Sequence, residues 1–230
     1  MRTIETSHLW RVNDLDIFYT NETNGGGNGL GEDYFNIVNE LYPGRTFENA
    51  LEWCSGPGFI GYAMLATGIC NNLSLNDIHQ PALDMAELTK LKNPKYTDKI
   101  SIYQGSTIDG IPETVQFDLV VANPPHFVSQ RDAGTKLGIS IDFNTPHIEE
   151  ILVDTNWKAH TDFYNSIKKR LSPDGIILIQ ENQVGSVNRS NSFVHIIENA
   201  GLKVTGEFNS LVHYREHTGM QIYYIEVQHK

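Results

Sequence analysis

The sequence has few cysteines, few basic residues and no long apolar run, and each shortage excludes a class of protein. Its two cysteines, Cys54 and Cys70, are too few for a disulfide framework or a zinc knuckle, which fits a reducing compartment. The longest apolar runs, such as Phe117–Ala122 and Gly175–Ile179, fall far short of the ~20 residues needed to cross a bilayer, and Met1–Trp10 has no apolar signal core. We therefore expect a cytoplasmic protein without membrane contact.

Size and charge set further bounds. The chain has 230 residues, of which 40% are hydrophobic and 20% charged, so it suits one folded domain with an appendage. Its 17 basic residues face 28 acidic ones, which gives a formal net charge of −11 at pH 7. Such an excess of acid disfavours binding to polyanions.

Strands and helices alternate along the chain after an irregular start. The segment Met1–Asn28 has weak periodicity and ends in a glycine-rich, flexible stretch, and a helix is expected over 34–41. We take residues 1–48 as an N-terminal arm and helix, a possible substrate cover, and 49–230 as the main domain. Strands are expected at Leu51–Cys54, Leu73–Asn76, Ile100–Tyr103, Phe117–Ala122, Ile176–Gln180, Val204–Phe208 and Gln221–Val227, and helices at Phe59–Ala66, Pro81–Leu91, Phe163–Leu171 and Phe193–Ala200. This alternation predicts an α/β fold with a doubly wound, Rossmann-like, mostly parallel seven-stranded sheet and an antiparallel edge.

Three segments late in the chain carry separate expectations. The connection 127–160 is too long for an ordinary loop and is typical of a lid or binding loop. Its Trp157 and His160 either line a substrate pocket or pack on the core. Residues 172–175 are expected to form a turn, and Lys168-Lys169-Arg170 a solvated cluster. His213 and His217 have a spacing that suits a metal, but no third ligand is evident, so no metal site is expected.

The first motif is the run Glu52-Trp53-Cys54-Ser55-Gly56-Pro57-Gly58-Phe59-Ile60-Gly61. Glycines at a strand-to-helix turn let the backbone approach a ligand closely, although a purely structural turn is the alternative. The glycine spacing also fits a dinucleotide-binding fingerprint. Glu52, however, would face pyrophosphate in such a protein. A carboxylate there suits a ligand with a positive group and no phosphate, such as a sulfonium amino acid.

The second motif is the acid Asp77 at the end of the next expected strand. A carboxylate in this position accepts hydrogen bonds from both hydroxyls of a ribose, whichever adenosine-containing cofactor is bound. The alternative is an acid that stabilises the start of the helix beginning near Pro81.

The third motif, Asn123-Pro124-Pro125-His126, follows the almost wholly apolar strand Phe117–Ala122. The prolines fix the backbone, so that the Asn123 amide and the Pro124 carbonyl are held as two acceptors. Two fixed acceptors can take both hydrogens of a planar NH₂ group and turn its nitrogen lone pair towards a methyl donor. A strand-terminating turn is the alternative reading.

These motifs resemble the class I S-adenosylmethionine-dependent N-methyltransferases with an Asn-Pro-Pro-aromatic signature. The chain is similar to release-factor glutamine methyltransferases and to small methyltransferase domains over Leu51–Leu202. The resemblance implies that S-adenosyl-L-methionine is the cofactor and Asn123, Pro124, Pro125 and His126 form the catalytic group. It places Glu52, Cys54, Gly56, Gly58, Asp77, Ile78, Ser106 and Asn123 around the cofactor.

The chain departs from the family pattern at two positions. His126 stands where relatives have Tyr, Phe or Trp, and imidazole is smaller and ordinarily titrates near neutrality. Ser106 stands where many relatives carry an acid that contacts the adenine amino group. The N-terminal arm shows no likeness to the helical domain that recognises release factors, so glutamine in a release factor is not the expected acceptor.

We therefore predict methyl transfer to an amide or amine nitrogen of a protein side chain or small molecule. Residues 1–50 hold three basic against eight acidic side chains, and 127–160 hold three against five. An acidic rim opposes phosphate contacts and favours a neutral or cationic acceptor over nucleic acid. The alternatives are an RNA or DNA base amino methyltransferase, an NAD-dependent oxidoreductase and a catalytically silent adaptor with the same fold.

Overall fold

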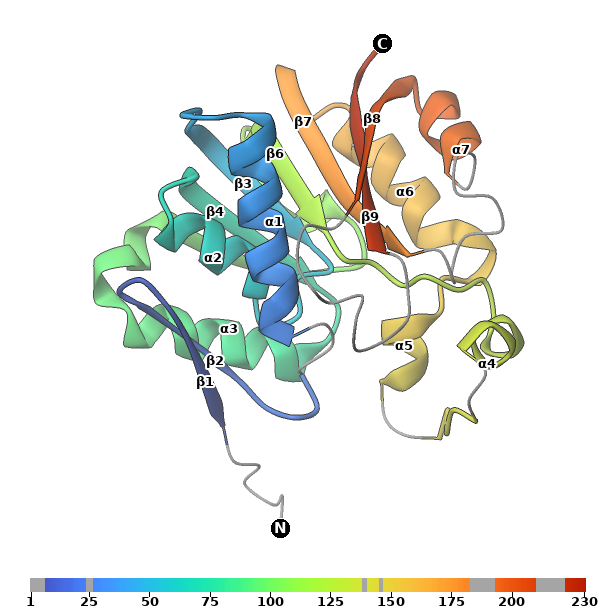
Figure 1. The fold of residues 1–230 in the computed structure, drawn as a ribbon, viewed down its shortest axis with the longest axis horizontal. Coiled ribbons are helices and arrows are strands. Elements are labelled where there is room, and N and C mark those ends of the chain that lie inside the picture. The colour runs from blue at the N-terminus through green and yellow to red at the C-terminus, as the bar shows by residue number, and fades with distance from the viewer. Residues whose placement is uncertain (1–6, 24–26, 138–139, 145–146, 183–192, 210–221) are drawn as a thin grey trace. The chain divides into compact units, whose positions relative to one another are not determined.

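The computed structural model describes residues 7–23, 27–137, 140–144, 147–182, 193–209 and 222–230 (Figure 1). The pair His213 and His217 therefore lies outside the described residues. The chain forms two compact units, residues 1–106 and 107–230, and each is described by itself. None of the helices in the described ranges is long and apolar enough to cross a membrane.

The first unit is built on three parallel strands in the order β5-β4-β3. These are β3 (Phe47–Trp53), β4 (Cys70–Asp77) and β5 (Ile100–Gln104), and the helices are α1 (Gly27–Leu41), α2 (Phe59–Ala66) and α3 (Gln80–Lys92), followed by a 3₁₀ turn at Pro94–Lys99. α2 has the bounds that its apolar pattern predicts. Seven of its eight residues are buried, so it packs as a core helix rather than an amphipathic one.

A β-hairpin that the sequence did not predict occupies part of the N-terminal arm. It pairs β1 (His8–Val12) with β2 (Leu15–Tyr19) in antiparallel fashion. The backbone N–H of Asp16 donates to Asn93 Oδ1 and that of Phe18 to Thr89 Oγ1, both at 2.9 Å, which fastens β2 to the end of α3. The expectation of an irregular arm is wrong here, because these anchors come from residues more than seventy positions away. The expected flexible glycine stretch also extends too far, since α1 begins inside it, at Gly27.

The second unit contains four strands in the order β6-β7-β9-β8. They are β6 (Phe117–Ala122), β7 (Leu171–Asn182), β8 (Leu202–Asn209) and β9 (Ile222–His229); the helices are α4 (Gln130–Leu137), α5 (Ile148–Leu152), α6 (Lys158–Ile167) and α7 (Val194–Asn199), with 3₁₀ turns at Ile108–Gly110 and Thr155–Trp157. β6 and β7 are parallel, whereas β9 runs antiparallel to both of its neighbours. The seven strands of the two units confirm the predicted mostly parallel, mixed α/β sheet.

Three expectations for the second unit need correction. The turn expected at 172–175 lies within β7, where the pairing with β6 jumps from Leu171 to Ile176 and leaves the residues between as an irregularity of the strand. The helix expected at Phe163–Leu171 is α6, which begins at Lys158 and ends at Ile167. Arg170 is not solvated: it is 8% exposed and donates to the carbonyls of Ile111, Pro112 and Val115, so it fixes the segment that leads into β6.

The long connection 127–160 is tied together near its two ends. The backbone N–H of Phe127 donates to the carbonyl of Leu152 at 3.0 Å, and the N–H of Asp154 donates to the carbonyl of Phe127 at 2.8 Å. Phe127 itself is buried. The start of the connection is therefore held to a segment near its end, with α4 and α5 between the two.

Candidate functional site

In the first unit, three parallel strands end side by side, and the loops that follow them carry most of the predicted cofactor residues. The N–H of Gly56 donates to Asp77 Oδ2 at 2.7 Å, which joins the loop after β3 to the end of β4. The N–H of Gly105 donates to the carbonyl of Asp77 at 2.9 Å, which joins the loop after β5 to the same residue. Ligands of open α/β sheets bind at such carboxyl ends.

The loop after β3 adopts backbone conformations that favour glycine. Cys54, Gly56 and Gly58 have φ angles of 54°, 54° and 91°. A Cβ added to Gly58 would lie 2.6 Å from the ring of Tyr62, so packing also requires a glycine there. A Cβ on Gly56 would meet no atom within 4 Å among the residues that the structure describes. Gly56 therefore presents bare backbone to open space, as a ligand-binding turn does.

Glu52 lies beneath this loop rather than on its surface. The residue is 2% exposed, and its carboxyl group accepts the backbone N–H groups of Gly61 at 2.7 Å and Ile60 at 3.3 Å, in the first turn of α2. Burial raises the pKa of Glu52 to about 8, and the nearby charge of Asp77 acts in the same direction. Glu52 thus supplies acceptors for N–H groups that every helix start leaves open, and it fixes α2 behind the glycine loop.

Asp77 has one partner on each oxygen. Besides the N–H of Gly56 on Oδ2, the N–H of His79 donates to Oδ1 at 2.8 Å. Burial raises the pKa of Asp77 above its usual value, although these hydrogen bonds oppose the rise. An ionised carboxylate offers about four lone pairs, so two remain for the hydroxyls of a ligand. The adjoining Ile78 is 43% exposed, an apolar side chain left open beside this carboxylate.

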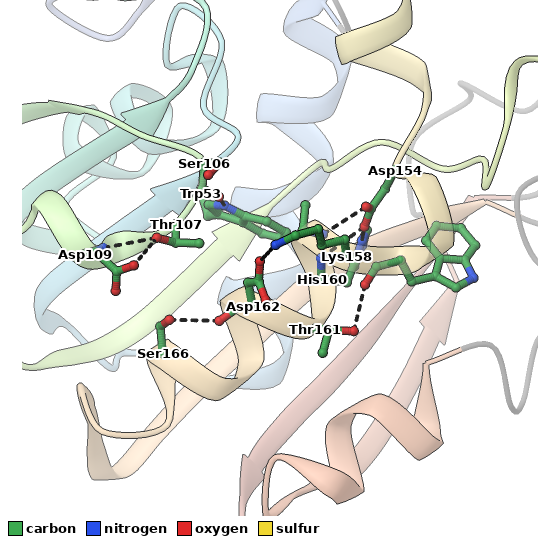
Figure 2. A network of polar contacts seen from close by, with 12 residues as sticks. Trp53, Ser106, Thr107, Asp109, Asp154, Lys158, His160, Thr161, Asp162 and Ser166 are labelled. Carbon is green, nitrogen blue, oxygen red and sulfur yellow. Dashed lines mark hydrogen bonds and ion pairs between the residues drawn. The ribbon is translucent and has the colours of Figure 1, made fainter.

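Ser106 follows β5 at the end of the first unit. Its backbone carbonyl accepts the indole N–H of Trp53 at 3.1 Å, a bond drawn in Figure 2. Trp53 is 1% exposed and comes from β3, so a buried side chain holds the backbone of the loop at Ser106 in place. The serine side chain is exposed and available to a ligand.

In the second unit, Asn123 follows β6 directly. Its amide oxygen lies 3.0 Å from His126 Nε2. Pro124 is buried and Pro125 half-buried, so the backbone of the motif is packed as well as conformationally restricted. The four predicted catalytic residues are consecutive and directly follow a buried strand, and the contact between Asn123 and His126 is the one that the structure adds.

His126 does not behave as an ordinary histidine. Burial lowers its pKa to about 4, the charge of His160 lowers it further, and a hydrogen bond with Gln180 acts in the opposite direction. The expectation that this imidazole titrates near neutrality is therefore wrong. His126 is neutral at pH 7.

Next to it, Asp154 and His160 form a buried pair (Figure 2). The sequence indicated His160 as a candidate residue but not Asp154. His160 Nδ1 lies 2.6 Å from Asp154 Oδ2, and the two residues are 0% and 4% exposed. Asp154 also accepts the N–H groups of Ala159 and His160, so it closes the first turn of α6. Although burial acts to raise it, these bonds hold the pKa of Asp154 below its usual value. An acid a few residues before a helix start is the sequence signal that could have revealed it.

The structure supports the packing interpretation of Trp157 and His160, whereas a contact with substrate stays a prediction. The ring of His160 stacks on Phe193 at 4.5 Å, and Trp157 meets both rings edge-on, which shows that they pack together. Trp157 also borders a cavity of about 200 Å³ between α6 and α7, together with Thr161, Asn165 and other polar residues.

Residues 37–141 match the family model of the methyltransferase small domain. Over 101 residues the chain is 28% identical to a release factor glutamine methyltransferase of Leptospira interrogans, and the aligned segment covers 44% of this chain and 35% of that protein. Over 136 residues it is 28% identical to a bifunctional methyltransferase of Rickettsia conorii, which covers 58% of this chain and 25% of that one. The chain thus spans about a third or less of the length of these curated relatives.

Solved structures show the same architecture. The M. jannaschii tRNA m1G37 methyltransferase aligns with a TM-score of 0.59 and 11% identity, covering 99% of this chain and 56% of that one. The ribosomal protein L11 methylase of Lactobacillus delbrueckii aligns with a TM-score of 0.56 and 11% identity, covering 87% and 79%. This chain has the class I methyltransferase fold. The predicted fold and the predicted family likeness are both confirmed.

The methyltransferase family implies S-adenosylmethionine as cofactor, and the first unit fits this molecule. Gly56 offers open space at a strand end, Asp77 keeps acceptor capacity for two hydroxyls, and Ile78 leaves an apolar surface exposed beside them. These are features that a ribose and an adenine ring need. The assignment of single residues to the cofactor remains a prediction.

Proposed function

We propose that this chain is an S-adenosylmethionine-dependent N-methyltransferase whose acceptor is an amide or amine nitrogen of a protein side chain or small molecule. One observation carries the proposal. Asn123 directly follows a buried strand, and His126 Nε2 lies 3.0 Å from its amide oxygen. This contact holds the oxygen in one direction, as a hydrogen-bond acceptor for the substrate NH₂ group must be held. A strand-terminating turn alone does not require a fixed amide.

On the cofactor side, each predicted residue has a distinct role. Gly56 and Gly58 shape the turn, Asp77 accepts the ribose hydroxyls, Ile78 lies against the adenine, and Ser106 accepts or donates at the adenine edge. Cys54 contributes its backbone at the same turn. Glu52 acts by holding α2 and the loop rather than by direct contact, since it is 2% exposed and its oxygens accept two backbone N–H groups beneath the loop. When bound, the cofactor supplies a methyl group activated by its sulfonium.

On the acceptor side, Asn123 Oδ1 and the Pro124 carbonyl accept the two hydrogens of the NH₂ group. This orients the nitrogen lone pair for an in-line displacement, in which positioning supplies much of the rate enhancement. Transfer to an oriented nitrogen needs no strong base. His126 fits this scheme, because a group with a pKa of about 4 is a poor proton acceptor at pH 7.

The acceptor is neutral or cationic. The first fifty residues and the connection 127–160 both carry more acid than base, which opposes the phosphate contacts that nucleic-acid binding requires. Relatives with this fold are named for both kinds of acceptor, a release factor glutamine in one case and a transfer RNA in another. The charge of this chain favours a protein or small-molecule acceptor over nucleic acid.

The experiment is methyl transfer from labelled S-adenosylmethionine to separate extracts of protein, RNA, DNA and small molecules, over a range of salt concentrations. We expect label in the protein or small-molecule extract, with little effect of salt. Preferred labelling of RNA or DNA that declines steeply with salt contradicts the proposed acceptor but not the transfer reaction. Calorimetry that shows binding of NADH and not of S-adenosylmethionine contradicts the function itself.

A further inference from the structure

His126 stands where related motifs carry a larger aromatic ring, and its imidazole is turned towards the asparagine of its own motif. The Nε2 atom lies 3.0 Å from Asn123 Oδ1. An amide oxygen only accepts, so Nε2 carries the hydrogen and donates it. The contact therefore assigns His126 to the tautomer protonated at Nε2.

The surroundings of His126 keep this tautomer neutral. Gln180 on β7 hydrogen-bonds the ring, and the charge of His160 on α6 disfavours a second proton on it. His160 is itself paired with Asp154 at 2.6 Å, inside the core. With burial as the main cause, the pKa of His126 is about 4, so the ring keeps a single hydrogen throughout the physiological range.

We infer that His126 is a positioning residue. Its hydrogen bond to Asn123 Oδ1 fixes the amide, so that the remaining lone pair of that oxygen accepts an N–H hydrogen of the nitrogen to be methylated. The inference rests on the proposed N-methyl transfer and adds a role to a residue that departs from the family pattern. An unrestrained amide rotates, and a rotated amide presents its own NH₂ to the NH₂ of the acceptor. The bond from His126 prevents this as long as the ring carries its hydrogen on Nε2, because an NH₂ group facing Nε2–H would find no acceptor there.

Two substitutions at His126 separate the hydrogen bond from the ring. His126→Phe keeps a flat ring of the kind seen in relatives and removes the donor, whereas His126→Gln keeps an N–H donor and removes the ring. His195→Gln is the matched control, since His195 is an exposed histidine on α7. Each variant is assayed with labelled S-adenosylmethionine and graded amounts of the extract that the wild type labels best.

We expect His126→Phe to lower kcat about fivefold to tenfold, which is the effect of losing one neutral hydrogen bond in the transition state. His126→Gln recovers much of this loss, and His195→Gln behaves as the wild type. The affinity for S-adenosylmethionine, measured by calorimetry, stays within about twofold in all three. A Phe variant with the wild-type kcat overturns the inference, and so does one that loses cofactor affinity together with turnover, because that pattern indicates a structural role.

Nitrogen NMR of the wild-type imidazole provides a readout that needs no turnover. We expect His126 to be neutral and protonated at Nε2 from pH 6 to pH 8, and kcat to show no ionisation of a histidine in that range. A ring protonated at Nδ1, or doubly protonated at pH 7, overturns the inference even if a variant fails to fold. A wild type that labels no extract refutes the proposed function and the inference with it, whereas an active wild type with an equally active Phe variant refutes the inference alone.

Discussion

Replacing Asp77 tests the cofactor half of the site most sharply, because the structure defines what this carboxylate already holds. Its two oxygens accept the N–H groups of Gly56 and His79 at 2.7 and 2.8 Å. The ribose hydroxyls would add two bonds to a charged acceptor. Losing even one hydrogen bond to a charged group costs about 1.5–3 kcal/mol, so Asp77→Ala should weaken S-adenosylmethionine binding by at least roughly tenfold to over a hundredfold.

The assay is calorimetry with S-adenosylmethionine and its demethylated product, both of which share the ribose. Asp77→Asn keeps one acceptor oxygen and should lose less affinity than Asp77→Ala. Asp84→Ala is the control, since Asp84 is an exposed acid on α3 that hydrogen-bonds Gln80. Unchanged affinity in a folded Asp77→Ala protein would refute the reasoning, and an equal loss in Asp84→Ala would show that only net charge matters.

Three further predictions concern the scaffold. The pKa of Glu52 rises from 4.5 to about 8 on folding, so its neutral carboxyl contributes most to the stability of the folded state below pH 4.5. Urea denaturation should therefore show that the free energy of unfolding falls from pH 5 to pH 8. The fall should be less steep in Glu52→Gln. An identical slope in that variant contradicts the assignment. Gly61→Ala places a Cβ 2.6 Å from Leu73 and 2.8 Å from Glu52 Oε2, so the free energy of unfolding should drop by about 1–3 kcal/mol, whereas full stability would show that α2 can shift. Arg170→Met leaves three carbonyls without their donor and should cost about 2–4 kcal/mol in the same measurement; a loss below about 0.5 kcal/mol would mean that water replaces the guanidinium.

Local chemistry made the strand ends predictable from the sequence. The bounds of α2 and β6 match the expectation because an apolar run, a glycine loop and a pair of prolines mark their ends within a few residues. The glycine turn expected after β3 is also present, and Gly56 and Gly58 have positive φ angles there. Where a short segment carries its own start and stop signals, its structure can be read without the rest of the chain.

The features that the sequence did not reveal depend on distant partners. The hairpin β1–β2 is fixed by Asn93 and Thr89 of the α3 end, which no local pattern indicates. The direction of the Glu52 carboxyl depends on how closely α2 packs on β3, and the low pKa of His126 depends on burial beside His160. Composition and spacing identify such residues, but only tertiary packing determines what they contact.

The central claim is that the Asn123 amide orients the nitrogen that receives the methyl group. The most direct test compares Asn123→Ala with Asn71→Ala, a control at an exposed asparagine near the start of β4, for methyl transfer to the extract that the wild type labels and for S-adenosylmethionine affinity. We predict that Asn123→Ala lowers turnover by ~10²-fold or more while cofactor affinity changes only a few fold, and that Asn71→Ala changes neither. Wild-type turnover in a folded Asn123→Ala protein would contradict the claim and leave Asn123 as the end of a strand.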